Sequence, residues 1–139
     1  MVDVVTPEKR SAMMSGIRSK NTKPEIAVRK RVFAEGFRYR LHARNLPGKP
    51  DLVLARYNVA VFIHGCFWHG HECKNGRLPK TNRDFWKKKI TKNIENDLRA
   101  TKALRSSGWK VVTIWECQLE KGTAKLLTLL KNLRKPDRL

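Results

Sequence analysis

The chain lacks any apolar stretch that approaches the roughly 20 residues a transmembrane helix needs. Its N-terminus also lacks the basic-then-apolar order of a secretory signal peptide. Cysteine is scarce, with three among 139 residues, and an odd number would leave one thiol over in a secreted disulfide framework. In a reducing compartment, thiols near histidines are more often metal ligands than disulfide partners. We therefore expect a soluble cytoplasmic protein without a membrane partner.

Acidic residues are few: 12 Asp and Glu stand against 31 Lys and Arg, which gives a formal net charge of +19. This excess predicts a polyanionic partner and is typical of nucleic-acid-binding domains. Because hydrophobic residues make up 40% of the chain, a disordered polybasic tail is excluded. The length suits one domain with its own core. Charge thus indicates the class of partner, although it says nothing of the reaction.

Periodicity and turn signals predict a mixed α/β domain. Thr22 and Glu25 form a capping box for a helix that ends near Gly36. The other expected helices cover residues 6–17, 81–107 and 126–133, and the expected strands cover residues 37–41, 51–54, 59–63 and 109–115. Steps of four residues predict that the buried face of the helix over 81–107 carries Trp86, Ile90, Ile94 and Leu98.

Cysteine and histidine gather in one segment. Cys66, His71 and Cys73 lie close together in the sequence, and Cys117 follows far downstream. Thiolate and imidazole are donors that zinc prefers, and four of them would complete a tetrahedral shell with no place for water, which indicates a structural site. His64 and His69 compete with His71 as the fourth ligand. The alternative is that the cysteines are buried free thiols beside incidental histidines.

Asp51 opens an apolar strand after a Gly-Lys-Pro turn. A carboxylate at such a place can hold Mg²⁺ in a basic cleft. Metal-assisted phosphodiester cleavage also needs a base that activates water, and the candidates are His69, His64, Glu25 and Asp97. Each carboxylate has a simpler interpretation: a strand-start aspartate for Asp51, a capping residue for Glu25 and a solvated partner of lysines for Asp97.

Two aromatic residues, Phe67 and Trp68, lie inside the ligand-rich loop. Beside a lysine-rich surface such side chains can stack on bases or wedge between base pairs, although they could also pack under the loop. By its spacing, Trp86 belongs to a helix core. The run Lys87–Lys89 with Lys92 is either a solvated helix face or a surface that follows phosphates, and the net charge favours the second.

The motifs together resemble a known family. Leu46-Pro47-Gly48-Lys49-Pro50-Asp51, His64-Gly65-Cys66-Phe67-Trp68-His69-Gly70-His71-Glu72-Cys73 and Trp115-Glu116-Cys117 are similar to the very-short-patch repair mismatch endonucleases. The resemblance implies a restriction-endonuclease-like α/β fold with a central sheet flanked by helices. It also implies Mg²⁺-dependent nicking of one DNA strand, 5′ to the thymine of a T:G mispair. Such mispairs arise when 5-methylcytosine deaminates.

The family pattern assigns roles to residues of this chain. By resemblance, Asp51 and the backbone carbonyl of Ile63 hold Mg²⁺, and His69 activates the attacking water. Glu25, His64 and Asp97 organise metal-bound waters or the phosphate. The resemblance makes Cys66, His71, Cys73 and Cys117 the zinc ligands, and it places Phe67, Trp68, Trp86 and Met14 against the DNA.

The domain organisation follows from these assignments. We expect a single endonuclease domain over residues 1–139, with a DNA-clamping helix in 1–20, a zinc and aromatic loop in 64–80 and a basic C-terminal helix in 118–139. Its expected partners are double-stranded DNA in the nucleoid and other mismatch-repair proteins, and a monomer suffices to cut one strand. Two alternatives stay open: an endonuclease with a different DNA target, and a zinc-stabilised nucleic-acid-binding module without catalysis.

Overall fold

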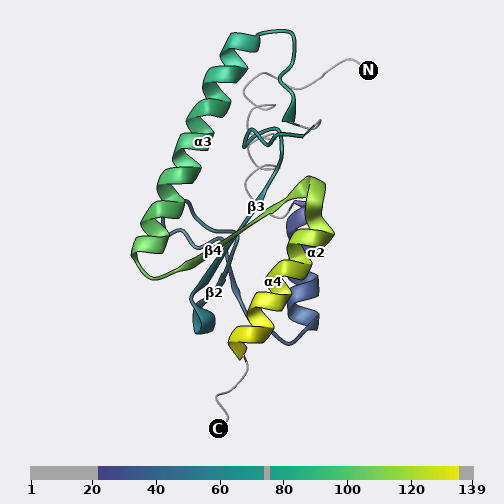
Figure 1. Ribbon diagram of the computed structural model, residues 1–139, viewed down its shortest axis with the longest axis vertical. Helices are drawn as coiled ribbons and strands as arrows, with labels where there is room; N and C mark the ends of the chain where they lie inside the picture. The colour runs from purple at the N-terminus through teal and green to yellow at the C-terminus, as the bar shows by residue number, and fades with distance from the viewer. Residues whose placement is uncertain (1–21, 74–75, 135–139) are drawn as a thin grey trace, which may run out of the picture.

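The computed structural model describes residues 22–73 and 76–134, and a four-stranded sheet in the order β1-β2-β3-β4 lies at its centre. The strands are β1 (Arg40–Leu41), β2 (Leu52–Leu54), β3 (Val59–His64) and β4 (Lys110–Trp115). β2 pairs antiparallel with both β1 and β3, whereas β4 runs parallel to β3. Helices α2 (Lys23–Ala34) and α4 (Leu119–Arg134) cover one face of the sheet, and α3 (Arg83–Ser106) covers the other (Figure 1). The predicted mixed α/β class is confirmed.

Alternation along β3 assigns its side chains to the two faces. Val59 and Val61 belong to the core shared with α2 and α4. Ala60 and Phe62 pack instead with Leu104 of α3. The same alternation carries His64 to the α3 side at the carboxyl end of the strand, and this places an imidazole where β3 leaves the sheet.

Helix α2 begins as the capping box predicts. The Thr22 side chain accepts a hydrogen bond from the backbone N–H of Glu25 at 3.3 Å. Gly36 follows the helix with a positive φ of 92°, a conformation that glycine adopts without steric cost. Val28 and Val32 are fully buried against α4 and the sheet. The predicted start and end of this helix are confirmed, and its first turn fixes the position of Glu25.

The buried face predicted for α3 is partly wrong. Leu98 is 66% exposed, whereas Ile90, Ala100 and Leu104 are buried. Steps of four residues turn about 40° further than a full helical turn each time, so three such steps from Trp86 leave the buried face. The core therefore passes from Ile90 to Ala100 and Leu104.

Two further predictions need correction. The strand expected over 37–41 is limited to Arg40–Leu41, and Leu41 is 38% exposed. Its start is shortened because β2 pairs with these two residues alone and turns into a short 3-10 helix at Ala55. The last helix begins at Leu119 rather than near residue 126. Gly122 weakens the helical pattern there. A Cβ at Gly122 would come within 2.8 Å of Ile114 Cγ2, so close packing on β4 explains the glycine.

The helix expected over 6–17 lies outside the described residues. Among residues 22–73 and 76–134, no helix combines the length and apolar character that a membrane crossing requires.

Candidate active site and metal cluster

Two adjoining hollows, of about 330 and 260 Å³, lie at the carboxyl end of β3 and share Asp51, Ile63, His64, Trp68 and His69 in their walls. Asp97 of α3 lines the first and Glu25 of α2 lines the second. The structure thus brings together all five residues predicted to be catalytic, from two helices, a strand and two loops.

Asp51 is held at the edge of the sheet by the backbone. Its Oδ2 accepts a hydrogen bond from the N–H of Ile63 at 2.7 Å. The pKa of Asp51 is raised to about 6: burial is the main cause and the charge of Glu25 adds to it, while the Ile63 hydrogen bond and two histidines oppose the rise. Two neighbouring carboxylates in a buried place are stabilised by a cation. Asp51 and the Ile63 carbonyl could supply the oxygen ligands that Mg²⁺ prefers.

His69 is oriented by Asp97. The distance from His69 Nδ1 to Asp97 Oδ2 is 2.6 Å. An ionised carboxylate only accepts hydrogen bonds, so Nδ1 carries the proton and Nε2 is left as the basic nitrogen. This arrangement suits a general base.

The ring of His64 stacks on that of His69, with centroids 3.7 Å apart and 3° between the planes. The pKa of His64 is lowered to about 4, mainly by burial and also by the neighbouring His69, while Asp97 opposes the shift. The acceptor atoms of His64, His69 and Asp97 lie within 4.8 Å of one another. Imidazole binds a metal in its ring plane, however, and two parallel planes do not converge on one ion. The stacked pair therefore suits proton transfer better than shared metal binding.

A second cluster holds the predicted zinc ligands. Ligand atoms of Cys66, His71, Cys73 and Cys117 lie within 4.8 Å of one another, and Cys117 Sγ is 3.4 Å from His71 Nδ1. None of the three cysteines forms a disulfide. His71 joins the thiols, whereas His64 and His69 lie with Asp97. Such a set could close around a tetrahedral ion. Burial raises the pKa of the Cys66 thiol to about 12, a cost that a bound metal would offset.

The metal cluster and the catalytic cavity are joined by the end of β4. The Trp115 ring stacks on His71 at 4.2 Å and meets His64 edge-on at 5.2 Å. Next to it, Glu116 Oε1 accepts a hydrogen bond from the N–H of Cys66 at 3.0 Å. An ion in the cluster would therefore fix the loop that carries His69.

The loop after β3 presses its backbone against α3. Gly70 has a φ of 64°, and a Cβ there would come within 2.5 Å of Ile94 Cδ1. The amide of Asn93 donates a hydrogen bond to the carbonyl of Trp68 at 2.9 Å. These two contacts place the loop's aromatic residues beside the helix.

Three predicted DNA-contacting aromatics form one cluster. The ring centroids of Phe67, Trp68 and Trp86 lie between 5.1 and 5.7 Å apart, and Phe85, 59% exposed, packs on Trp86. Phe67, Trp68 and Trp86 are only half-buried. The core position that spacing alone predicts for Trp86 is wrong, because the ring packs on the loop and not under the sheet.

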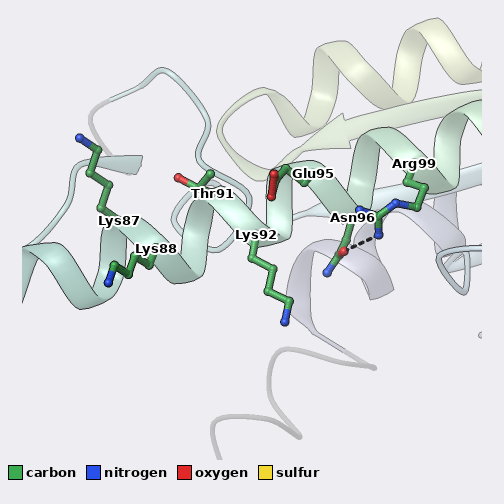
Figure 2. A pocket seen from close by; sticks show the side chains of 7 residues that line it. All are labelled: Lys87, Lys88, Thr91, Lys92, Glu95, Asn96 and Arg99. Atoms are coloured by element: carbon green, nitrogen blue, oxygen red, sulfur yellow. Dashed lines mark hydrogen bonds between the residues drawn. The ribbon is translucent and has the colours of Figure 1, made fainter.

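A basic groove of about 580 Å³ runs along the exposed side of α3. Figure 2 shows Lys88, Lys92 and Asn96 extending from the same side of the helix. Asn96 accepts a hydrogen bond from Arg99 at 3.0 Å and also lines the hollow that holds Asp51 and Asp97. The groove therefore adjoins the cavity that holds Asp51 and Asp97. It is lined by Lys87, Lys88, Thr91, Lys92, Glu95, Asn96 and Arg99.

Sequence reasoning missed several residues around the site. His42 contacts Glu25, Asn93 holds Trp68 and Glu116 holds Cys66. His42 could have been noticed as the one histidine outside the ligand-rich segment. The contacts of the Asn93 amide and the Glu116 carboxylate leave no local pattern in the sequence. Met14, predicted to contact DNA, lies outside the described residues.

An acid–histidine cavity beside a basic groove is the arrangement expected of a hydrolase that acts on the nucleic-acid backbone. Comparison with known proteins agrees with this class. The family model of DNA mismatch endonuclease Vsr matches residues 2–75, and the chain belongs to this family of DNA endonucleases.

Individual relatives match over most of their length. The chain is 52% identical to the Type II nicking enzyme V.NmeAIP of Neisseria meningitidis serogroup A over 120 residues, or 86% of each chain. It is 45% identical to the Type II nicking enzyme V.XorIIP of Xanthomonas oryzae over 137 residues, or 99% of this chain and 100% of that one. It is also 39% identical to the DNA mismatch endonuclease Vsr of Escherichia coli over 131 residues, or 92% of this chain and 84% of the other.

Proposed function

We propose that the protein nicks one strand of duplex DNA 5′ to the thymine of a T:G mispair and so initiates repair of deaminated 5-methylcytosine. The observation that carries the proposal is the single cavity in which Asp51, tied to Ile63 N–H at 2.7 Å, faces His69 and adjoins Trp68. Relatives named as nicking enzymes and as a DNA mismatch endonuclease support the same conclusion.

The proposed chemistry uses the residues of the cavity. Asp51 and the Ile63 carbonyl would hold Mg²⁺, which when bound supplies charge stabilisation at the scissile phosphate. His69 Nε2 accepts the proton of the attacking water, while Asp97 keeps the imidazole oriented and stabilises its protonated form. His64 packs against His69 as a neutral ring, and Glu25 organises the water molecules near Asp51.

The aromatic cluster would supply mispair recognition. Phe67, Trp68 and Trp86 present half-buried rings, packed edge to face, beside the catalytic cavity. Inserting such rings into a duplex costs unstacking energy, and this cost is lower at a weak base pair. A mispair is therefore the place where the wedge enters most readily, which would align the neighbouring phosphate with Asp51.

The Cys66, His71, Cys73 and Cys117 cluster would bind zinc as a structural ion. Four thiolate and imidazole donors fill a tetrahedral shell, and Glu116 and Trp115 connect that shell to the catalytic loop. We propose that the enzyme acts as a monomer, since one cavity cuts one strand.

The test is a nicking assay with Mg²⁺ on duplexes labelled on either strand. The substrates carry T:G, each other mispair, or the matched T:A pair at one position. We expect a single nick beside the thymine of the T:G duplex and none with Asp51→Asn. Equal cleavage of matched duplex would retain the nuclease and reject the mispair specificity, and a preference for another mispair would replace the target.

A further inference from the structure

His42 lies at the margin of the proposed site and has no role in the proposed chemistry above. It follows β1 directly, and its φ of 49° places a non-glycine residue in the left-handed region. Its backbone N–H donates a hydrogen bond to the carbonyl of Asp51 at 3.0 Å. A left-handed conformation is unfavourable for a non-glycine residue and persists where the surrounding structure imposes it. Here the strained turn aims the imidazole at Glu25.

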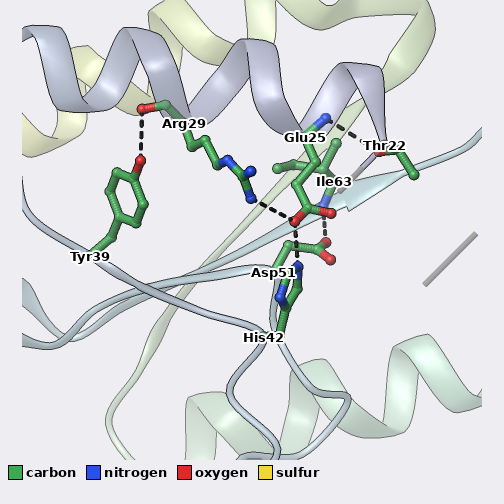
Figure 3. A network of polar contacts seen from close by, with 7 residues as sticks. All are labelled: Thr22, Glu25, Arg29, Tyr39, His42, Asp51 and Ile63. Atoms are coloured by element: carbon green, nitrogen blue, oxygen red, sulfur yellow. Dashed lines mark hydrogen bonds and ion pairs between the residues drawn. The ribbon is translucent and has the colours of Figure 1, made fainter. Parts of the chain in front are cut away.

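Glu25 is a buried carboxylate, only 2% exposed, and two side chains hold its Oε1. His42 Nε2 and Arg29 both contact Oε1, the guanidinium at 3.5 Å. Figure 3 shows the other oxygen, Oε2, on the side where the Asp51 carboxylate lies, and both residues line the same hollow.

The two partners of Oε1 differ in what they fix. Arg29 is on the same helix as Glu25, one turn further along, so it moves with α2. His42 comes from the sheet side, adjacent to Asp51 by a backbone hydrogen bond. Only the His42 contact therefore ties the Glu25 carboxylate to the element that carries Asp51.

We propose that His42 is a positioning residue that holds Glu25 Oε1 and thereby presents Oε2 to the hydrated divalent cation at Asp51. The inference rests on the proposed metal-dependent function. Outer partners of metal-site carboxylates commonly change metal affinity or activity by 10- to 100-fold when they are removed.

Two substitutions separate the hydrogen bond from the backbone conformation. Asn is well tolerated in the left-handed region but is too short to reach Glu25, so His42→Asn removes the contact and keeps the turn. Gln places an N–H donor at a reach similar to that of imidazole Nε2, so His42→Gln restores the contact. Tyr39→Phe is the matched control, because it removes a 3.2 Å hydrogen bond to the Arg29 carbonyl without touching the Glu25 carboxylate.

The first readout is the Mg²⁺ concentration for half-maximal nicking, measured with the single-turnover rate and with duplex affinity in the absence of Mg²⁺. We expect His42→Asn to need about 10-fold more Mg²⁺ or to react about 10- to 100-fold more slowly, with unchanged duplex affinity. His42→Gln should stay within about 3-fold of wild type, and Tyr39→Phe should match it. A His42→Asn enzyme with wild-type metal dependence and rate would overturn the proposal, as would His42→Gln being as impaired as His42→Asn.

A second readout does not depend on cleavage. A divalent cation that binds only the folded chain raises its melting temperature with concentration, so Mn²⁺ can be titrated against each variant. Wild type and His42→Gln should show the same shift, His42→Asn should need more Mn²⁺, and Asp51→Asn should show none. If the wild type shifts with Mn²⁺ but cuts no DNA, the proposed function fails while the role of His42 is still decided. Equal shifts for His42→Asn and wild type would reject that role.

Discussion

The imidazole of His64 lies flat against that of His69, 3.7 Å away and with 3° between the ring planes. Two protonated rings could not share this arrangement without repulsion, and burial already holds the pKa of His64 near 4. In the proposed mechanism His64 therefore stays neutral when His69 accepts the proton of water. The two histidines have different surroundings, although both occur in the same sequence motif.

In the proposed mechanism Asp97 makes His69 an effective base, and Asp97→Asn tests this. The amide would remove the negative charge 2.6 Å from His69 Nδ1 and would no longer stabilise imidazolium. Because general-base catalysis contributes about 10²- to 10⁴-fold, we expect kcat to fall by at least about 100-fold, with duplex binding unchanged. Asp84→Asn, the same chemical change at an exposed position of α3, should retain wild-type kcat. A small loss in Asp97→Asn would show that His69 does not need this partner.

Some of this site follows from local sequence. Thr22 and Glu25 are three residues apart, and a capping box depends only on such neighbours, so the start of α2 and the place of Glu25 were predictable. Asp51, His69 and the cysteines were identified by motif. That these segments lie together in one site was not predictable, because it depends on how β3 and β4 pair and on where α3 packs.

The errors have the same origin. Leu98 carries the right residue type at a plausible spacing, yet the packed stretch of α3 lies elsewhere. Gly122 disfavours a helix locally and is accommodated because the helix approaches Ile114 closely. His42 was overlooked because a left-handed φ and a contact to Glu25, 17 residues away, leave no periodic trace. Such features are set by tertiary packing.

Ionisation of Asp51 should destabilise the metal-free protein. Its pKa rises from 3.8 to about 6 on folding, so the stabilisation from its proton is complete below the unfolded value and is lost as pH rises through about 6. The loss amounts to about 3 kcal/mol at most. In a chelating buffer we expect Asp51→Asn to melt at a higher temperature than wild type at pH 7.5, with the gap closing towards pH 4.

The control for this comparison of melting temperatures is to add back the metal. Added Mg²⁺ should raise the melting temperature of wild type at pH 7.5 and have little effect on Asp51→Asn, since the amide lacks the negative charge that attracts the cation. A gap between the two proteins that is constant from pH 4 to 7.5 would contradict the raised pKa.

Cys117 should be needed for a structural zinc ion. Its thiol is exposed and lies 3.4 Å from His71 Nδ1, so Cys117→Ala opens the cluster without leaving a cavity in the core. Metal analysis should fall from about one zinc per chain towards none, and the free energy of unfolding should drop by several kcal/mol. Gln118→Ala, in the same short turn, should keep both. Identical melting curves for wild type with and without chelator would exclude a structural metal.

Trp68 should contribute more to discrimination than to affinity. Phosphate contacts position a protein on DNA, whereas contacts in the base stack distinguish sites. We expect Trp68→Ala to reduce the ratio of affinities for T:G and matched duplexes by about 10-fold or more, because stacking on a base is worth about 1 to 3 kcal/mol. Phe33, 52% exposed on α2, supplies the control Phe33→Ala, which should keep the ratio. Equal losses on both duplexes would mean that Trp68 only packs.

The basic groove of α3 should follow the phosphates that flank the cleaved bond. Lys88 and Lys92 are exposed one turn apart in this groove, and each phosphate that a lysine neutralises adds about 0.9 to the slope of log affinity against log salt. Replacing both by Ala should lower that slope by about 2 and weaken matched and mispaired duplexes equally. Lys121 and Lys125 have the same spacing on α4, across the sheet (Figure 1), and their double substitution should leave the slope unchanged. If the slope of log affinity against log salt falls by the same amount in both double variants, the net charge of the chain, rather than the groove beside Asp97, governs binding.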